Sequence, residues 1–150
     1  MKTVILYSSF HKGNTKKIVD AVAEKHQIPA VNVAQQKEMN LSDYDCIGIA
    51  SGVAFSKYYP QMLDFLKKNL PENKKVFFMH TAGLPRENHN AAAKEITDGK
   101  NCTCLGTFFC KGFDAYGALK LIGGINKKSP KESDIQNAQK FVDKILAKYV

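Results

Sequence analysis

The sequence has a single arginine, no block of clustered basic residues and no nucleic-acid-binding motif. Of its 150 residues, 22 are lysine or arginine and 14 are aspartate or glutamate, so the formal charge is +8. A basic chain can bind nucleic acid, but arginine, the usual reader of bases, occurs only at Arg86. The lysines are spread along the chain, without zinc-finger spacing or an RNA-binding aromatic motif. We therefore expect no nucleic-acid partner.

Long hydrophobic segments are also missing. The apolar runs are far shorter than the roughly 20 residues that a membrane-spanning helix needs. The residues after Met1 and Lys2 form a short β-like run, without the cleavage site of a secretory signal. We expect a cytoplasmic protein with no membrane association, and a chain of 150 residues suits one domain, residues 1–150.

The four cysteines do not form a metal-binding pattern. Cys46, Cys102, Cys104 and Cys110 include no C-x-x-C pair, and the four histidines are scattered. Cysteine among apolar residues usually behaves as a small buried side chain. We therefore expect free thiols, which suit the cytoplasm, and no metal site.

Five continuous apolar runs predict buried strands. They cover residues 3–7, 30–33, 46–50, 75–79 and 104–109. Because they are continuous rather than alternating, most resemble parallel strands that are covered on both faces. The sequence therefore predicts a parallel sheet with helices on either side.

Amphipathic stretches lie between these runs. Apolar residues repeat at helical spacing over residues 18–23, 59–66 and 135–146, whereas residues 35–44 fit either a short helix or a loop. Strands that alternate with helices indicate a single doubly wound α/β domain.

Two helix boundaries carry signals of their own. Ser129 before Pro130, with Glu132 beyond, predicts an N-cap and a capping box for the last helix. Gly99 predicts a left-handed helix stop.

In a doubly wound sheet, ligands bind beyond the carboxyl ends of the strands. Residues 8–15 follow the first strand and combine hydroxyls, an amide and a glycine with the start of a helix, a combination that binds phosphate. The Walker and G-x-G-x-x-G patterns are absent. The alternative is an ordinary strand-to-helix turn, since hydroxyls and asparagine also favour helix caps.

Three further segments follow strands at the same edge. Residues 51–59, 80–85 and 110–117 mix glycine or small residues with apolar or aromatic ones. Together with the first loop, they predict a site for a flat aromatic ligand that carries a phosphate group.

Residues 9–15 resemble the flavodoxin phosphate-binding loop, Ser/Thr-x-Thr-Gly-Asn-Thr, in a variant form. Residues 41–52 are similar to the stretch that enters the third flavodoxin strand, and residues 110–127 are similar to a group of small flavodoxin-family proteins. The resemblance covers nearly the whole chain. It implies a short-chain flavodoxin, with a five-stranded parallel sheet in the order 2-1-3-4-5 and bound FMN.

The resemblance also implies the residues that contact FMN. The phosphate would be held by Ser9, His11, Gly13, Asn14 and Thr15, with Ser8 nearby. One side of the isoalloxazine ring would be bordered by Gly52, Val53, Ala54 and Phe55. The other would be bordered by Thr81, Ala82 and Gly83, and the pocket completed by Cys110, Gly112 and Phe113.

The sequence departs from the family pattern in two ways. Ala54 stands where flavodoxins commonly keep a glycine beside flavin N5, and alanine is disfavoured at positive φ. We therefore expect weak stabilisation of the one-electron-reduced flavin. Flavodoxins are acidic around the flavin, whereas the basic residues expected here are His11, Lys12, Lys57, Arg86 and Lys111.

These features favour an FMN-binding electron carrier, rather than an enzyme, that serves redox partner proteins with an acidic docking surface. We expect a monomer or weak dimer. The alternative is an FMN-dependent NAD(P)H reductase acting on a quinone or similar small acceptor. A response-regulator domain would need aspartates where Ser8, Ser9 and Ser51 stand.

Overall fold

Five parallel strands form the central sheet of the computed structural model, which describes residues 1–10, 13–113, 123–126 and 128–149. They are arranged in the order β2-β1-β3-β5-β6, which confirms the predicted 2-1-3-4-5 order of the parallel strands. An additional short strand, β4, pairs antiparallel with the end of β3. The strand bounds are β1 (Thr3–Ser8), β2 (Ala30–Asn32), β3 (Cys46–Ala54), β4 (Lys57–Tyr58), β5 (Lys75–Ala82) and β6 (Thr103–Lys111).

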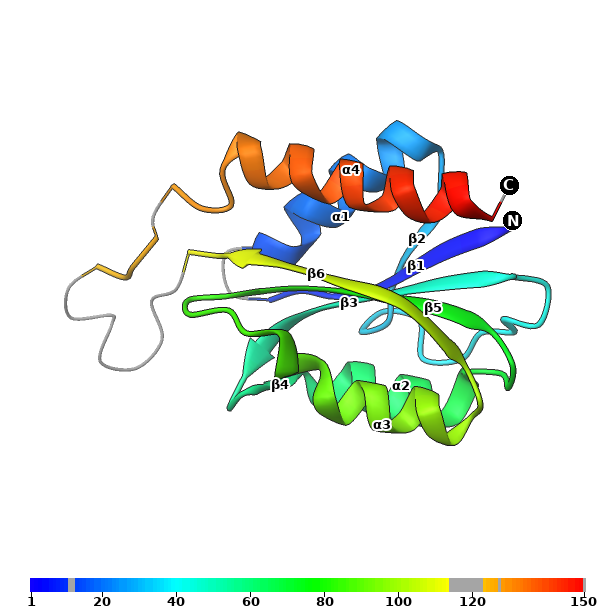
Figure 1. Ribbon diagram of the computed structural model, residues 1–150. Coiled ribbons are helices and arrows are strands. Elements are labelled where there is room, and N and C mark those ends of the chain that lie inside the picture. Colours follow the sequence, from blue (N-terminus) through cyan, green and yellow to red (C-terminus); the bar gives the residue numbers. More distant parts are fainter. Residues whose placement is uncertain (11–12, 114–122, 127, 150) are drawn as a thin grey trace.

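Helices cover both faces of the sheet (Figure 1). One face carries α1 (Asn14–His26) and α4 (Glu132–Lys148). The other carries α2 (Pro60–Asn69) and α3 (Ala91–Gly99), which follows the short 3-10 helix η2 (Glu87–Asn90). None of the helices in the described part of the chain is long and apolar enough to cross a membrane.

Alternate residues of each strand supply two hydrophobic cores. In β1, Val4 and Leu6 belong to the core that includes α2, whereas Ile5 and Tyr7 belong to the core that includes α1 and α4. Every residue of β1 is buried. This two-sided burial is the reason that the strand is a continuous apolar run.

Two helix boundaries differ from the sequence prediction. The N-cap of α4 is Lys131 rather than Ser129, because the Asp134 carboxylate accepts a hydrogen bond from the Lys131 N–H at 2.8 Å. Gly99 is the last residue of α3, and the left-handed residue beyond it is Asn101, at φ 55°. Residues 35–44 contain no helix.

Candidate functional site

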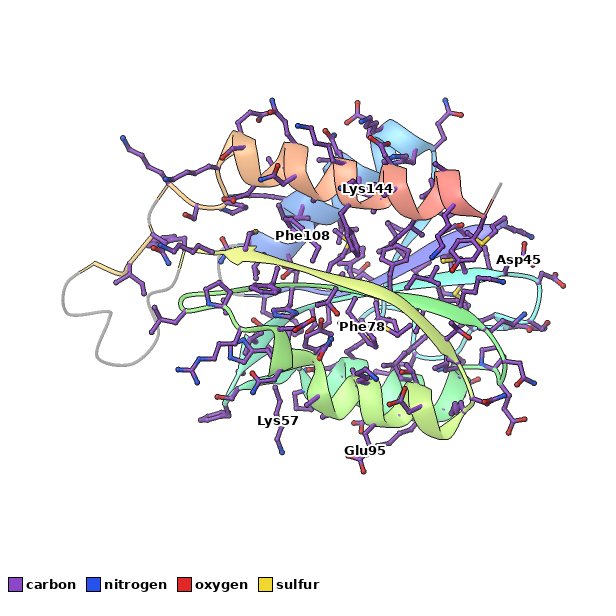
Figure 2. The ribbon with its side chains drawn as sticks, viewed as in Figure 1. Asp45, Lys57, Phe78, Glu95, Phe108 and Lys144 are labelled. Atoms are coloured by element: carbon purple, nitrogen blue, oxygen red, sulfur yellow. The ribbon has the colours of Figure 1, made fainter. Side chains whose placement is uncertain are left out.

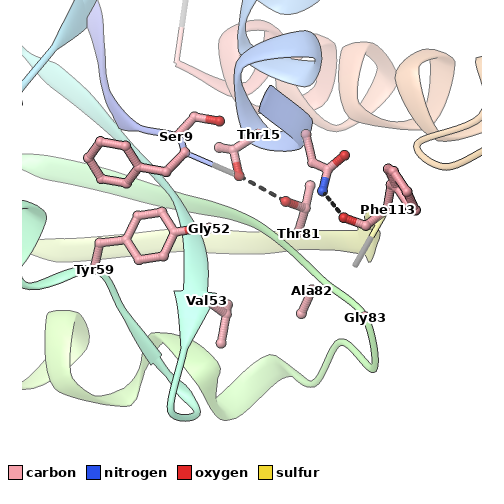
Figure 3. A pocket seen from close by; sticks show the side chains of 11 residues that line it. Ser9, Thr15, Gly52, Val53, Tyr59, Thr81, Ala82, Gly83 and Phe113 are labelled. Atoms are coloured by element: carbon pink, nitrogen blue, oxygen red, sulfur yellow. Dashed lines mark hydrogen bonds between the residues drawn. The ribbon is translucent and has the colours of Figure 1, made fainter. Parts of the chain in front are cut away.

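A pocket lies beyond the carboxyl ends of β1, β3 and β5 (Figure 3). The end of β3 and the segments that follow β1, β5 and β6 all contribute to it, as the order of the strands requires. The lining residues are Ser9, Phe10, Asn14, Thr15, Gly52, Val53, Tyr59, Thr81, Ala82, Gly83 and Phe113.

The start of α1 supplies backbone donors to this pocket. Gly13 is the N-cap at φ 65°, a left-handed conformation that glycine adopts readily, and it has no side chain that could cap the helix. The Ser9 hydroxyl accepts a hydrogen bond from the Lys16 N–H at 3.1 Å. Asn14 and Thr15, the first two helical residues, line the pocket. The positive end of the α1 dipole therefore lies where an anion would be stabilised.

Two buried polar atoms in the segment from the end of β1 to the first residue of α1 have no hydrogen-bond partner among the described residues. They are Ser8 Oγ, at the end of β1, and Asn14 Oδ1. A buried polar atom without a partner costs about 1 to 3 kcal/mol, so such atoms are rare unless a ligand or water completes them. The Ser8 hydroxyl can donate to an anionic oxygen, and Asn14 Oδ1 can accept from a hydroxyl or N–H group. The two atoms suit a ligand that carries both an anion and donors.

Side-chain hydrogen bonds tie the loops of the pocket together. Thr15 Oγ1 lies 2.8 Å from Thr81 Oγ1, and Asn14 Nδ2 donates to the Phe113 carbonyl at 2.7 Å (Figure 3). Gly112 packs against the same amide, because a Cβ there would lie 2.7 Å from Asn14 Nδ2. The helix start is thereby joined to the end of β5 and to the segment that follows β6.

Asn126 provides a second connection between these segments. Its Nδ2 donates to the Gly83 carbonyl at 2.8 Å and lies 3.4 Å from the Gly112 carbonyl. No sequence pattern singles out this asparagine, because the contacts join residues that are distant in the chain.

A hairpin forms another wall of the pocket. Strand β3 extends to Ala54 and turns back into β4, so that Val53 pairs with Tyr58. The two turn residues, Phe55 and Ser56, have φ values of 53° and 63°. The left-handed backbone therefore lies at these residues and not at Ala54, where the sequence comparison placed it.

The base of the hairpin is fixed by buried contacts. The Ser51 hydroxyl accepts a hydrogen bond from the Tyr59 N–H at 3.1 Å and donates to the Gly52 carbonyl at 2.7 Å. A Cβ at Gly52 would lie 2.5 Å from the Tyr59 hydroxyl, so only glycine allows this ring to approach the strand. Phe10 packs on the same ring, with centroids 5.1 Å apart.

His80 joins the hairpin to the segment that follows β5. Its Nδ1 lies 2.9 Å from the Tyr58 hydroxyl, and its Nε2 lies 2.6 Å from the Arg86 carbonyl oxygen. Because a carbonyl can only accept, Nε2 carries the proton and Nδ1 accepts from Tyr58. Burial lowers the pKa of His80 to about 4, and the neighbouring His89 contributes to the lowering. The ring is therefore neutral at pH 7.

Residues 4–104 match the family model described as a flavodoxin domain. The chain belongs to the flavodoxin domain family. An uncharacterized protein of Methanocaldococcus jannaschii is 37% identical over 148 residues, covering 97% of this chain and 99% of that protein.

Solved flavodoxins share the fold. A flavodoxin from the domain Archaea superposes with a TM-score of 0.66 at 16% identity, covering 97% of both chains. The Fusobacterium nucleatum flavodoxin bound to flavin mononucleotide superposes with a TM-score of 0.67 at 11% identity, covering 100% of both chains. At these identities the superpositions establish the flavodoxin fold.

The flavodoxin fold brings most of the predicted site residues to one place. Phe10 and Tyr59 also line the pocket but were not predicted, because aromatic residues are equally common in cores. His11 lies outside the described residues. The predicted residues that line the pocket are Ser9, Asn14, Thr15, Gly52, Val53, Thr81, Ala82, Gly83 and Phe113.

Other predicted residues lie beside the pocket rather than in its lining. Gly13, as the N-cap of α1, and Gly112, packed against Asn14, support it. Ser8 ends β1 and is buried. Cys110 is buried, and burial raises the pKa of its thiol to about 12, so it is no nucleophile at neutral pH. Phe55, at the hairpin turn, is 99% exposed.

Proposed function

We propose that this chain binds FMN at the pocket and transfers electrons between redox proteins. The observation that carries the proposal is the start of α1 in the lining of the pocket, preceded at the end of β1 by a buried Ser8 hydroxyl that has no partner among the described residues. A phosphate there would receive hydrogen bonds from the hydroxyl and from first-turn N–H groups, in the favourable field of the helix dipole. When bound, FMN supplies a ring that takes up and releases electrons.

The remaining residues of the pocket fit the rest of FMN. Asn14 Oδ1 needs a donor, and the ribityl hydroxyls and ring N–H of FMN are donors. Val53 on one side and Ala82 on the other would border the ring, with backbone groups of Gly52 and Gly83 close by. The hydrogen bonds of Thr15 and Asn14 hold these walls in position before a ligand arrives.

The direct experiment is a titration of the purified, flavin-free protein with FMN, followed by quenching of flavin fluorescence. We expect saturation at one FMN per chain and a shifted visible spectrum. Failure to saturate at micromolar FMN would overturn the proposal.

The alternative, an NAD(P)H reductase, is separated from a carrier by steady-state kinetics. A carrier loaded with FMN should oxidise NADH or NADPH no faster than free FMN does, with or without added quinone. Turnover above that background would favour the reductase.

We further infer a cytoplasmic location and a partner with an acidic docking surface. All four cysteines are free, as expected in a reducing compartment. The exposed Lys57, Arg86 and Lys111 lie in or beside the segments that border the pocket, so an approaching partner meets positive charge.

A further inference from the structure

Exposed apolar side chains gather around the pocket. Among the described residues, the large hydrophobic side chains that remain exposed are Phe10, Phe55, Leu84 and Phe109, at 42%, 99%, 73% and 39%. The first three belong to the segments that border the pocket, and Phe109 stacks on the His80 ring at 5.4 Å. Exposed apolar side chains that border one pocket, on a protein whose other described large hydrophobic side chains are not exposed, indicate an interaction site.

Phe55 is the most exposed of these residues, and its backbone has a left-handed conformation that is unfavourable for a bulky side chain. A two-residue turn with φ near +55° at both positions is normally built from Asn-Gly or a similar pair. Phe55 and Ser56 adopt φ 53° and 63° instead. A bulky side chain is disfavoured in this region, and a fully exposed phenyl ring gains no burial within the fold. A strained position that carries a fully exposed ring points to a role between molecules.

Buried contacts fix the backbone of the hairpin that carries Phe55. Tyr58 is buried, lies 2.9 Å from His80 Nδ1, and pairs with Val53. The Tyr59 N–H is held by Ser51. The strained turn is therefore secured from its buried base, so docking would require little ordering of the backbone that carries the ring.

The charges nearby select the chemistry of the partner. Lys57 follows the turn and Arg86 lies two residues beyond Leu84; both are exposed, and neither forms an ion pair with a described carboxylate. Glu87, also exposed, is the acidic residue adjacent to this group. The two cations beside the exposed apolar side chains are complementary to a partner surface on which carboxylates surround an apolar patch.

We propose that Phe55 is the anchor through which this chain docks onto an acidic electron-transfer protein, with Lys57 and Arg86 facing carboxylates of the partner. Aromatic anchors at the centre of a contact supply most of its binding energy, while charges at the rim set the association rate. The inference rests on the proposed function, since electrons must reach a ligand in the adjacent pocket.

The test measures electron transfer from the FMN-loaded protein, reduced beforehand with dithionite, to two c-type cytochromes. One cytochrome is acidic and the other lysine-rich. One electron passes from the reduced protein to ferric haem iron, which becomes ferrous, and the haem absorbance reports the rate in a stopped-flow instrument. The variants are Phe55→Ser, Phe55→Tyr, Lys57→Gln and, as a distant control, Lys148→Gln on α4.

We expect the wild type to react faster with the acidic cytochrome at low salt, and this rate to fall as salt is added. Phe55→Ser should lower it about tenfold. Lys57→Gln should lower it about threefold at low salt and have less effect at high salt. Phe55→Tyr, which keeps the ring, and Lys148→Gln should stay within about twofold of the wild type.

Two results would overturn the proposal: an unchanged rate for FMN-loaded Phe55→Ser, or no preference of the wild type for the acidic cytochrome. The FMN content and the rate of dithionite reduction are measured for every variant. A wild type that binds no FMN would refute the proposed function itself. A normally loaded Phe55→Ser with an unchanged rate would refute only the docking anchor.

Discussion

The two ends of the sheet both contain left-handed residues, but they place different side chains there. At the amino end, Asn73 and Asn101 have φ values of 63° and 55°, and Asn101 Nδ2 donates to Asn73 Oδ1 at 2.7 Å. At the carboxyl end, Gly13 and Asn126 are left-handed, but so are Phe55 and Ser56 at the hairpin turn. Asparagine tolerates this conformation, whereas a bulky phenylalanine is disfavoured in it. The carboxyl end therefore accepts strain at Phe55 that the two asparagines of the amino end avoid.

The hydrogen bonding of the two ends differs in the same way. At the amino end, Lys100 Nζ donates to three carbonyls near the C-terminus of α2, including Leu70 at 2.7 Å. At the carboxyl end, Ser8 Oγ and Asn14 Oδ1 lack partners among the described residues. Figure 2 shows Asp45 at the first end and Lys57 at the second. The difference supports the proposal that a ligand and a partner complete the carboxyl end.

The largest effect that we predict concerns His80, the buried link behind the hairpin. Its pKa is about 4 in the folded protein and near 6.5 when unfolded, so the unfolded state takes up a proton first as the pH falls. Between pH 6.5 and 4 this difference should remove about 3 kcal/mol of stability. The glutamine of His80→Gln can make both hydrogen bonds but does not titrate. This variant should therefore lose less stability than the wild type as the pH falls.

Denaturant unfolding of both proteins at pH 7 and pH 4.5 measures this difference. Other groups titrate in the same pH range. The informative quantity is therefore the stability that the wild type loses between pH 7 and pH 4.5 minus the stability that the variant loses. Equal losses in the two proteins would show that His80 is not the acid-sensitive group.

The next effect compares two glycines. At Gly112 a Cβ would lie 2.7 Å from Asn14 Nδ2, whereas at Gly99 it would meet nothing within 4 Å. We expect Gly112→Ala to displace Asn14 and weaken FMN binding by about 2 kcal/mol. Gly99→Ala should leave the affinity unchanged and, as a helical position, stabilise the fold slightly. Fluorescence titration gives the affinities; equal affinities would contradict the packing argument.

Ser8→Ala should change stability and affinity in opposite directions. Removing a buried hydroxyl without a partner should stabilise the flavin-free protein by up to about 1 kcal/mol. The same change should weaken FMN binding by about 1 kcal/mol, because the phosphate loses a donor. Thermal unfolding with and without FMN measures both effects. A variant that is destabilised without FMN would mean that this hydroxyl already has a partner.

The smallest effect exchanges side chains between the two ends. Phe55→Asn should stabilise the protein by about 0.5 to 1 kcal/mol, because asparagine suits the left-handed turn. The reverse exchange at the amino end, Asn73→Phe, should destabilise the protein by at least as much, since it also removes the contact with Asn101. Chemical denaturation at pH 7 checks both. A loss of stability in Phe55→Asn would show that the phenyl ring supports the fold.

Much of the fold could be predicted because the sheet is buried on both sides. Continuous apolar runs such as residues 46–50 identify central strands, and their order follows from the doubly wound pattern. Strand β4 could not be predicted, because Phe55 and Ser56 lack the glycine or asparagine that usually signals a tight hairpin.

The site could be predicted in part for a similar reason. Polar residues after a buried strand, such as Ser9 and Asn14, stand out against apolar neighbours. His80 and Asn126 could not be recognised, because their partners are brought near only by the fold. Ser129 was wrong as an N-cap because Asp134 satisfies the N–H of Lys131 instead.

The most direct test of the central claim compares FMN with riboflavin, which lacks only the phosphate. If the start of α1 and the Ser8 hydroxyl hold a phosphate, flavin-free protein should bind FMN at least about a hundredfold more tightly than riboflavin. The preference should shrink in Ser8→Ala. Equal affinity of the wild type for the two flavins would contradict the account.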